Sequence, residues 1–100
     1  MAWLIVSNDS EKGPAIRADQ RVMEAHWQYE LRHRALILAS GSLREDDGVT
    51  KTGSMVLLDV ATRQEAEAFF AEDPASRAGL RGATEIRWLN VAILDRQERS

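Results

Sequence analysis

The sequence contains no cysteine, which excludes a disulfide framework, a thiol nucleophile and a cysteine-ligated metal site. It also lacks an excess of basic residues, because 13 lysines and arginines stand against 16 aspartates and glutamates, for a net charge of -3. Nucleic-acid binding needs a basic face, so this balance argues against it. The strand expected at 54–60 also has no aromatic residue of the kind that an RNA-recognition fold uses for base stacking.

Long apolar runs are missing as well. No segment approaches the roughly 20 apolar residues of a membrane span. The start of the chain has no basic region, and its apolar run is too short for a signal peptide. We therefore expect a cytoplasmic protein that does not bind a membrane. The 100 residues, 44% hydrophobic and 29% charged, predict a single globular domain with a polar, frayed tail at 95–100.

Periodicity and turn residues predict alternating strands and helices. Apolar, β-forming runs predict four strands, at 2–8, 36–43, 54–60 and 84–89. The stretch 18–34 has no Gly or Pro and predicts the first long helix. Polar loops are expected at 8–14 and 45–48. The element order is therefore β-α-β-β-α-β, which is an α+β fold.

Capping residues mark the second helical region. Thr62 to Glu65 fits a capping box that starts a helix. Asp73 and Pro74 fit the cap and the first position of a further short helical turn. Gly79 is placed to end that turn.

The predicted sheet has an unexpectedly apolar second face. In this element order both crossover helices lie on one side of the sheet, because such crossovers are right-handed. The other face should then be polar. In 4–6 and 55–58, however, every residue is apolar, although consecutive residues of a strand point to opposite faces. Two explanations stay open. A second copy packs sheet against sheet as a two-fold dimer, or the segment 91–94 covers the face.

His26 lies near the middle of the broad apolar arc of the first long helix. It is either a core histidine bonded to a carbonyl or a general acid/base in a pocket, since imidazole titrates near neutral pH. His33 is two turns away, roughly 10 Å. The two rings are therefore too far apart to chelate one metal as an i, i+4 pair does, and we expect no metal.

Three further polar residues have two interpretations each. Asp73 fits a helix cap, and a capping carboxylate can also face a cleft. Ser54 follows Gly53 without the surroundings of a nucleophile elbow, so it either begins a strand or binds a ligand. Asp9 follows the first strand, where clefts often open, and equally fits an Asx turn.

Several motifs occur in an order that resembles the YciI-like (YCII-related) family of the dimeric α+β-barrel superfamily, over about residues 2–90. The matching segments are Ala25-His26-Trp27-Gln28-Tyr29, Ala39-Ser40-Gly41-Ser42, Thr52-Gly53-Ser54, Asp73-Pro74-Ala75-Ser76-Arg77-Ala78-Gly79-Leu80 and Glu85-Ile86-Arg87-Trp88. The Asp-Pro to Ala-Gly-Leu stretch and the spaced histidine are the most specific of these.

The resemblance implies a ferredoxin-like fold with a four-stranded antiparallel sheet and a homodimer that packs through the sheet face. It also implies a cofactor-free enzyme in which His26 and Asp73 perform acid/base chemistry. The substrate would be a small cyclic or aromatic molecule, and the reaction an isomerase, lyase or dehydrochlorinase type. The alternatives are a non-catalytic module that binds or senses a small ligand at the same pocket, and a structural domain without a pocket.

The substrate-binding candidates are Ser54, Asp9, Arg21 and Tyr29. The sequence departs from the family motif at Met23, where an arginine is usual. If that arginine normally holds an anionic substrate, Arg21 or Arg17 could take its place. Ala75 replaces the aromatic residue after Asp-Pro, and this change would enlarge or open the pocket.

Overall fold

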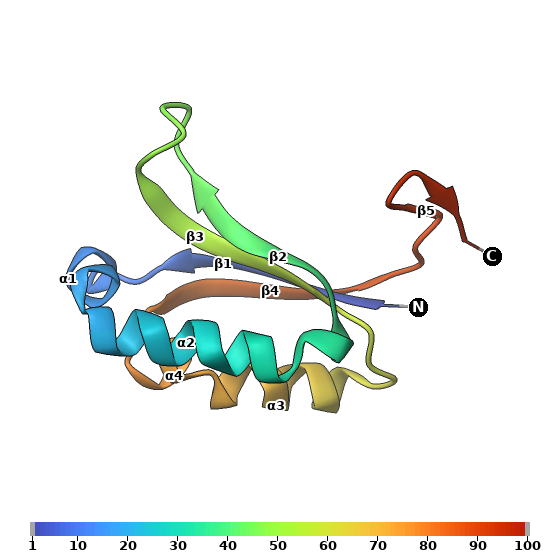
Figure 1. Cartoon of the computed structure of the whole chain (residues 1–100), viewed down its shortest axis with the longest axis horizontal. Coiled ribbons are helices and arrows are strands. Elements are labelled where there is room, and N and C mark those ends of the chain that lie inside the picture. The colour runs from blue at the N-terminus through green and yellow to red at the C-terminus, as the bar shows by residue number, and fades with distance from the viewer. Residues whose placement is uncertain (1, 100) are drawn as a thin grey trace.

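The computed structural model describes residues 2–99 and places the helices on one face of a four-stranded sheet (Figure 1). The sheet order is β2-β3-β1-β4, and every neighbouring pair is antiparallel. The elements are β1 (Ala2–Asp9), α1 (Gly13–Ala18), α2 (Gln20–Arg32), the 3-10 turn η1 (Arg34–Leu36), β2 (Ile37–Arg44), β3 (Lys51–Leu58), α3 (Arg63–Glu72), α4 (Pro74–Arg77), β4 (Arg81–Leu89), β5 (Ile93–Leu94) and β6 (Gln97–Glu98). The predicted β-α-β-β-α-β order is confirmed, with additional short elements.

The first additional element is α1, in a region where we expected a loop followed by the start of a longer helix. Pro14 stands in the first turn of α1, where its fixed φ suits a helix and its missing N–H costs nothing. Asp19 then separates α1 from α2, because its extended backbone ends one helix and its carboxylate accepts the Arg21 N–H at 3.0 Å to begin the next. The predicted helix at 18–34 is confirmed in its central part.

The caps of α3 and α4 form as predicted. Thr62 Oγ1 accepts the Glu65 N–H at 3.1 Å, and Glu65 Oε2 accepts the Ala61 N–H at 3.1 Å. Asp73 ends α3 and begins α4, accepting the Ala75 N–H at 2.9 Å. Gly79 follows α4 with a φ of 95°, a conformation that a residue with a Cβ rarely adopts.

Strands β3 and β4 both begin three residues earlier than predicted, and these extra residues build one end of the sheet. The β1–β4 register shifts between Ser7 and Asp9, which places Asp9 opposite Arg81. Gly53, next to this point, lies so close to β1 that a Cβ would be 2.5 Å from the Ser7 carbonyl oxygen. Only glycine permits this approach, which carries Ser54 close to β1.

The core lies between the sheet and the helices. Its buried members are Ile5, Tyr29, Val56, Leu58, Ala66 and Phe69. Side chains alternate between the two faces of a strand, so Leu4, Val6 and Leu57 point to the face without helices. On β1 and β3 this face is apolar, as predicted from the sequence, whereas β4 places the ion pair of Glu85 and Arg87 beside Val6 and Leu4.

The segment after β4 differs from the expected frayed tail. Ile93 and Leu94 pair with Gln97 and Glu98 in a small hairpin, and Ser100 lies outside the described residues. The hairpin stands beyond the end of the sheet and does not lie across the apolar face (Figure 1). In one copy of the chain, residues 91–94 therefore do not provide the cover that we considered. None of the helices in the described part of the chain is long and apolar enough to cross a membrane.

Candidate active site

His26 and Asp73, 47 residues apart in sequence, are in direct contact. His26 projects from the middle of α2, and its Nδ1 lies 2.9 Å from Asp73 Oδ1 and 2.8 Å from Oδ2. Asp73 reaches this position because it joins α3 to α4, with only 3% of its side chain exposed. An ionised carboxylate only accepts hydrogen bonds, so Nδ1 must be the donor. In the neutral ring, Nε2 then carries the free lone pair.

The second ring nitrogen has a carboxylate nearby but no hydrogen bond to it. Glu30 lies one helical turn after His26, and its Oε1 is 3.6 Å from Nε2. That separation is longer than a hydrogen bond. Nε2 is therefore free to exchange a proton with a ligand, and Glu30 would stabilise the imidazolium that results.

Asp73 is held by two donors besides His26. Its Oδ1 accepts the Ala75 N–H at the start of α4, and its Oδ2 accepts from Arg81 Nη2 at 3.1 Å. The helix cap and the contact with histidine, which we had treated as compatible, occur together. Asp73 is therefore fixed in orientation before any ligand arrives.

Arg81 connects this pair to the sheet. Its Nε donates to Ser76 Oγ at 3.0 Å, its Nη1 donates to Ser54 Oγ at 2.8 Å, and its guanidinium carbon lies 4.6 Å from the centre of the Phe70 ring. Burial lowers the pKa of Arg81, while the charge of Asp73 opposes that change. The side chain spans the site from Asp73 to Ser54.

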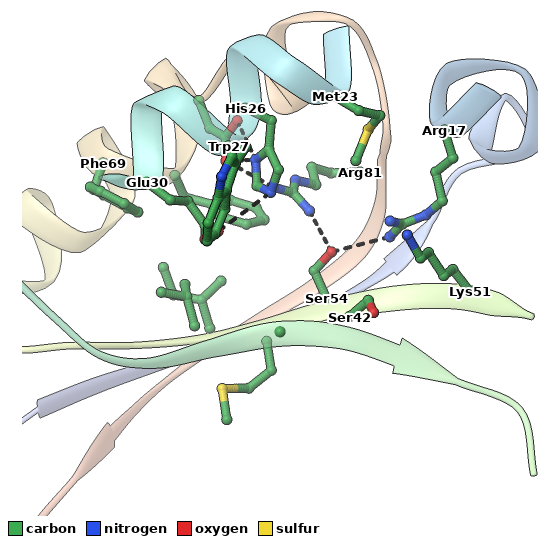
Figure 2. Close-up of a pocket in the computed structure, with 16 residues that line it drawn as sticks. Arg17, Met23, His26, Trp27, Glu30, Ser42, Lys51, Ser54, Phe69 and Arg81 are labelled. Atoms are coloured by element: carbon green, nitrogen blue, oxygen red, sulfur yellow. Dashed lines mark hydrogen bonds and ion pairs between the residues drawn. The ribbon is translucent and has the colours of Figure 1, made fainter. Parts of the chain in front are cut away.

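A second arginine reaches Ser54 from the other side. Arg17 Nη2 donates to Ser54 Oγ at 3.3 Å and to the Gly53 carbonyl oxygen at 3.0 Å. Its Nε and Nη2 also bind the Asp9 carboxylate at 2.6 and 2.9 Å. Figure 2 shows Ser54 between Arg81 and Arg17, joined to each by a dashed line.

These groups line a cavity of about 400 Å³ between α2 and the sheet. Its polar lining includes Arg17, His26, Glu30, Lys51, Ser54 and Arg81. Its apolar lining includes Ile5, Met23, Trp27, Val56, Phe69 and Phe70. A cavity of this size, apolar with a few convergent polar groups, suits a small organic molecule. The alternative of a structural domain without a pocket is thus excluded.

Two of the predicted binding residues lie elsewhere, and this corrects our expectation. Arg21 is exposed and borders a shallow hollow with Gln20, Glu24 and others on the outer side of α2. Tyr29 is 8% exposed, and its hydroxyl donates to the Phe69 carbonyl oxygen at 2.8 Å in the core. Burial raises the pKa of Tyr29, and the charge of Glu72 adds to that effect. Asp9 does not line the cavity but binds Arg17, which does.

Arg81, Glu30 and Lys51 were missed by the sequence analysis. Arg81 and Lys51 stood in segments that we assigned to no element, just before the predicted strands, and in the structure they are the first residues of β4 and β3. Glu30 could have been found, because it lies four residues after His26 and so on the same side of the helix. Among residues 2–99, no group of three or more His, Asp or Glu side chains is arranged to hold a metal ion.

Comparison with known proteins agrees with the motifs. The YCII-related domain model matches residues 1–90. The chain belongs to the YCII-related family. No curated protein matches the sequence.

Among solved structures, this YCII-related protein is similar to 5-chloro-2-hydroxyhydroquinone dehydrochlorinase (TftG) from Burkholderia phenoliruptrix AC1100, in complex with 2,5-dihydroxybenzoquinone. The two chains are 27% identical, with a TM-score of 0.77, and the match covers 90% of this chain and 94% of that chain. The predicted ferredoxin-like α+β fold is therefore confirmed.

Proposed function

We propose that this YCII-related protein is an enzyme that transfers protons on a small cyclic or aromatic molecule, with His26 as general acid/base and Asp73 as the group that orients it. One observation carries the proposal. The His26 ring is held by both Asp73 oxygens, at 2.9 and 2.8 Å, and borders a cavity of about 400 Å³.

The proton path follows from the orientation of the ring. Nδ1–H donates to Asp73, so Nε2 accepts a proton from an O–H or C–H group of the bound molecule. The imidazolium is stabilised by Asp73, as a carboxylate does for the histidine of a catalytic triad, and by Glu30. In an isomerisation the proton returns to another atom of the substrate. In a dehydrochlorination the electron pair of the broken O–H or C–H bond forms a new C=O or C=C bond, the C–Cl bond breaks, and chloride leaves with its bonding electrons. The proton then passes from Nε2 to water.

This chemistry needs no cofactor, because His26 accepts the proton and either returns it to the substrate or releases it to water. The likeness to a dehydrochlorinase supports a hydroxylated ring as the substrate class. Trp27 and Phe70 offer the ring an apolar surface inside the cavity. Ser54 offers it a hydrogen bond.

We further propose that residues 1–100 form one domain that works as a homodimer. The face of the sheet without helices carries Leu4 and Val6, which are half-buried in one chain, and a second copy would remove them from water. Sheet-to-sheet packing about a two-fold axis gives both copies the same contact.

The proposed activity is tested by turnover with a panel of chlorinated hydroquinones, hydroxylated aromatics and lactones. We expect His26→Asn to lower kcat by about a hundredfold or more on any substrate that the protein converts. His33→Asn is the matched control, since it makes the same change at the C-cap of α2, outside the cavity. Both variants are compared below their unfolding temperatures.

Two results would contradict the catalytic role. The first is unchanged turnover in His26→Asn. The second is thermal stabilisation by panel members without any product, and this would indicate a binding or sensing module.

A further inference from the structure

The hydroxyl of Ser54 accepts a hydrogen bond from Arg81 and can donate its own proton to a molecule in the cavity. A serine hydroxyl has one donor and two acceptor lone pairs. Arg81 Nη1 donates to Ser54 Oγ at 2.8 Å. Arg17 Nη2 lies 3.3 Å from Ser54 Oγ, but the shorter contacts of its two hydrogens are with Asp9 at 2.9 Å and the Gly53 carbonyl oxygen at 3.0 Å. No acceptor for the Ser54 O–H exists within residues 2–99. Ser7, opposite on β1, is buried without a hydrogen-bond partner and does not supply one.

Two further donors line the cavity near Ser54. Ser42 pairs with Ser54 across β2 and β3, and its Oγ accepts from Arg44 at 3.1 Å, which leaves its own O–H without an acceptor in the described chain. The side chain of Lys51, at the start of β3, forms no hydrogen bond or ion pair with the described residues. Figure 2 shows Lys51 and Arg17 on the side of Ser54 away from His26.

Two of the three arginine and lysine side chains that line the cavity are paired with carboxylates. Arg17 is neutralised by Asp9 at 2.6 Å, and Arg81 by Asp73 at 3.1 Å. Lys51 has no carboxylate to balance it. At the other end, the only ion-pair partner of Glu30 among the described residues is the His26 ring, with Oε1 3.6 Å from Nε2. The cavity therefore has a donor-rich, positive end at Ser54 and an acceptor-rich, negative end at Glu30.

We propose that the Ser54 end of the cavity is a recognition site for an ionised oxygen of the ligand, held by the O–H groups of Ser54 and Ser42 and the ammonium group of Lys51. A ligand that satisfies both ends carries an ionised oxygen at Ser54 and a hydroxyl group that donates to Glu30 or His26. Two kinds of small ring meet this requirement, a hydroxylated aromatic carboxylate and a hydroxyquinone with an acidic ring oxygen.

This inference deepens the proposed function, because it assigns a substrate class to the same cavity, and it concerns equilibrium binding only. Titration calorimetry compares two pairs of probes, para-hydroxybenzoate with the neutral para-hydroxybenzamide, and 2,5-dihydroxybenzoquinone with the neutral hydroquinone. We expect at least one ionised probe to bind about tenfold tighter than its neutral partner, the effect of one charge-assisted hydrogen bond. The pair that shows the preference identifies which kind of ring is recognised.

The two lysines of the chain provide a matched pair of variants. Lys51→Met removes the charge and keeps much of the side-chain length, and we expect it to abolish the preference for the ionised probe. Lys12→Met makes the same change on the exposed turn before α1 and should preserve the preference. Ser54→Ala should also weaken binding of the ionised probe, with circular dichroism confirming that it folds.

Three results would each overturn the inference. The first is equal binding of the ionised and neutral probes, and the second is a preference that survives in Lys51→Met. The third is no binding of either ionised probe at millimolar concentration. His26→Asn separates this result from the proposed function. That variant should keep the preference while losing turnover, so either idea can fail without the other.

Discussion

At the residue scale, the site depends on Asp73, whose two oxygen atoms accept from three partners. They meet the His26 ring, the Arg81 guanidinium and the Ala75 N–H. One side chain thus caps α4, pairs with a buried cation and fixes the tautomer of the histidine. The cap needs only an acceptor, whereas the other two roles need the negative charge.

Asp73→Asn separates these roles, because asparagine caps helices as well as aspartate does. We expect turnover to fall at least tenfold, and the free energy of unfolding to fall by about 3 kcal/mol, since Arg81 stays buried without its carboxylate. The matched control is Asp19→Asn, which changes the other capping aspartate, at the exposed start of α2. It should leave both quantities unchanged. Chemical denaturation and steady-state kinetics measure them, and wild-type turnover in Asp73→Asn would refute the role of the charge.

The sequence allowed His26 and Asp73 to be predicted because both stand in recognisable motifs. Arg81 could not be predicted, since its role depends on a strand boundary and on a register shift opposite Asp9. Periodicity locates the centre of a strand far better than its ends. The substitution of an arginine by Met23 drew attention to Arg21 and Arg17, and of these only Arg17 lines the cavity.

At the element scale, α2 presents different side chains to the sheet and to α3. His26 and Tyr29 are three residues apart, so they differ by about 60° around the helix axis. This angle is enough to place His26 in the cavity and Tyr29 against Phe69, with ring centres 5.1 Å apart. The sequence showed one broad apolar arc for both residues. It could not show which edge of that arc faces the cavity, because that depends on how the helix lies on the sheet.

Tyr29 makes the packing of α2 against α3 sensitive to alkaline pH. Its pKa is raised above the ordinary 10.0 in the folded chain, so the stability it contributes is complete below pH 10 and is lost as the pH rises through the folded-state pKa. Tyr29→Phe should cost about 1 kcal/mol at neutral pH, through the lost hydrogen bond to Phe69. It should also reduce the loss of stability above pH 10.

The chain has one tyrosine, so tyrosinate absorbance in the folded wild type reports on Tyr29 alone. Denaturation curves of both proteins at neutral pH and above pH 10 measure the stability difference. An equal alkaline loss in both proteins would show that Tyr29 does not cause it.

At the scale of the whole molecule, the helices cover one face of the sheet and leave the other without helices (Figure 1). The apolar second face could be predicted, because consecutive residues in two of the strands are apolar and point to opposite faces of the sheet. The short hairpin of β5 and β6 could not be predicted, because two-residue strands carry no periodicity. At its turn, Asp95 and Arg96 adopt positive φ angles. Such angles are usually predicted from glycine, and neither residue is glycine.

The proposed dimer predicts that a charge in the middle of the apolar face separates the two copies. Light scattering should give wild-type protein twice the 11.2 kDa mass of the chain, and Leu4→Glu the mass of one chain. Val49→Glu is the control, since Val49 is 72% exposed in the loop between β2 and β3. It should remain dimeric. A wild-type protein with the mass of one chain would rule out the dimer.

The central claim is that Asp73 holds His26 with Nδ1 protonated and Nε2 free for proton transfer. Nitrogen-15 NMR of the imidazole groups tests this without a substrate, and His33→Asn identifies the signals of His26. In the neutral ring, the account predicts that Nδ1 carries the proton in wild-type protein and that Asp73→Asn weakens this preference. A neutral His26 with its proton on Nε2 in wild-type protein would contradict the account.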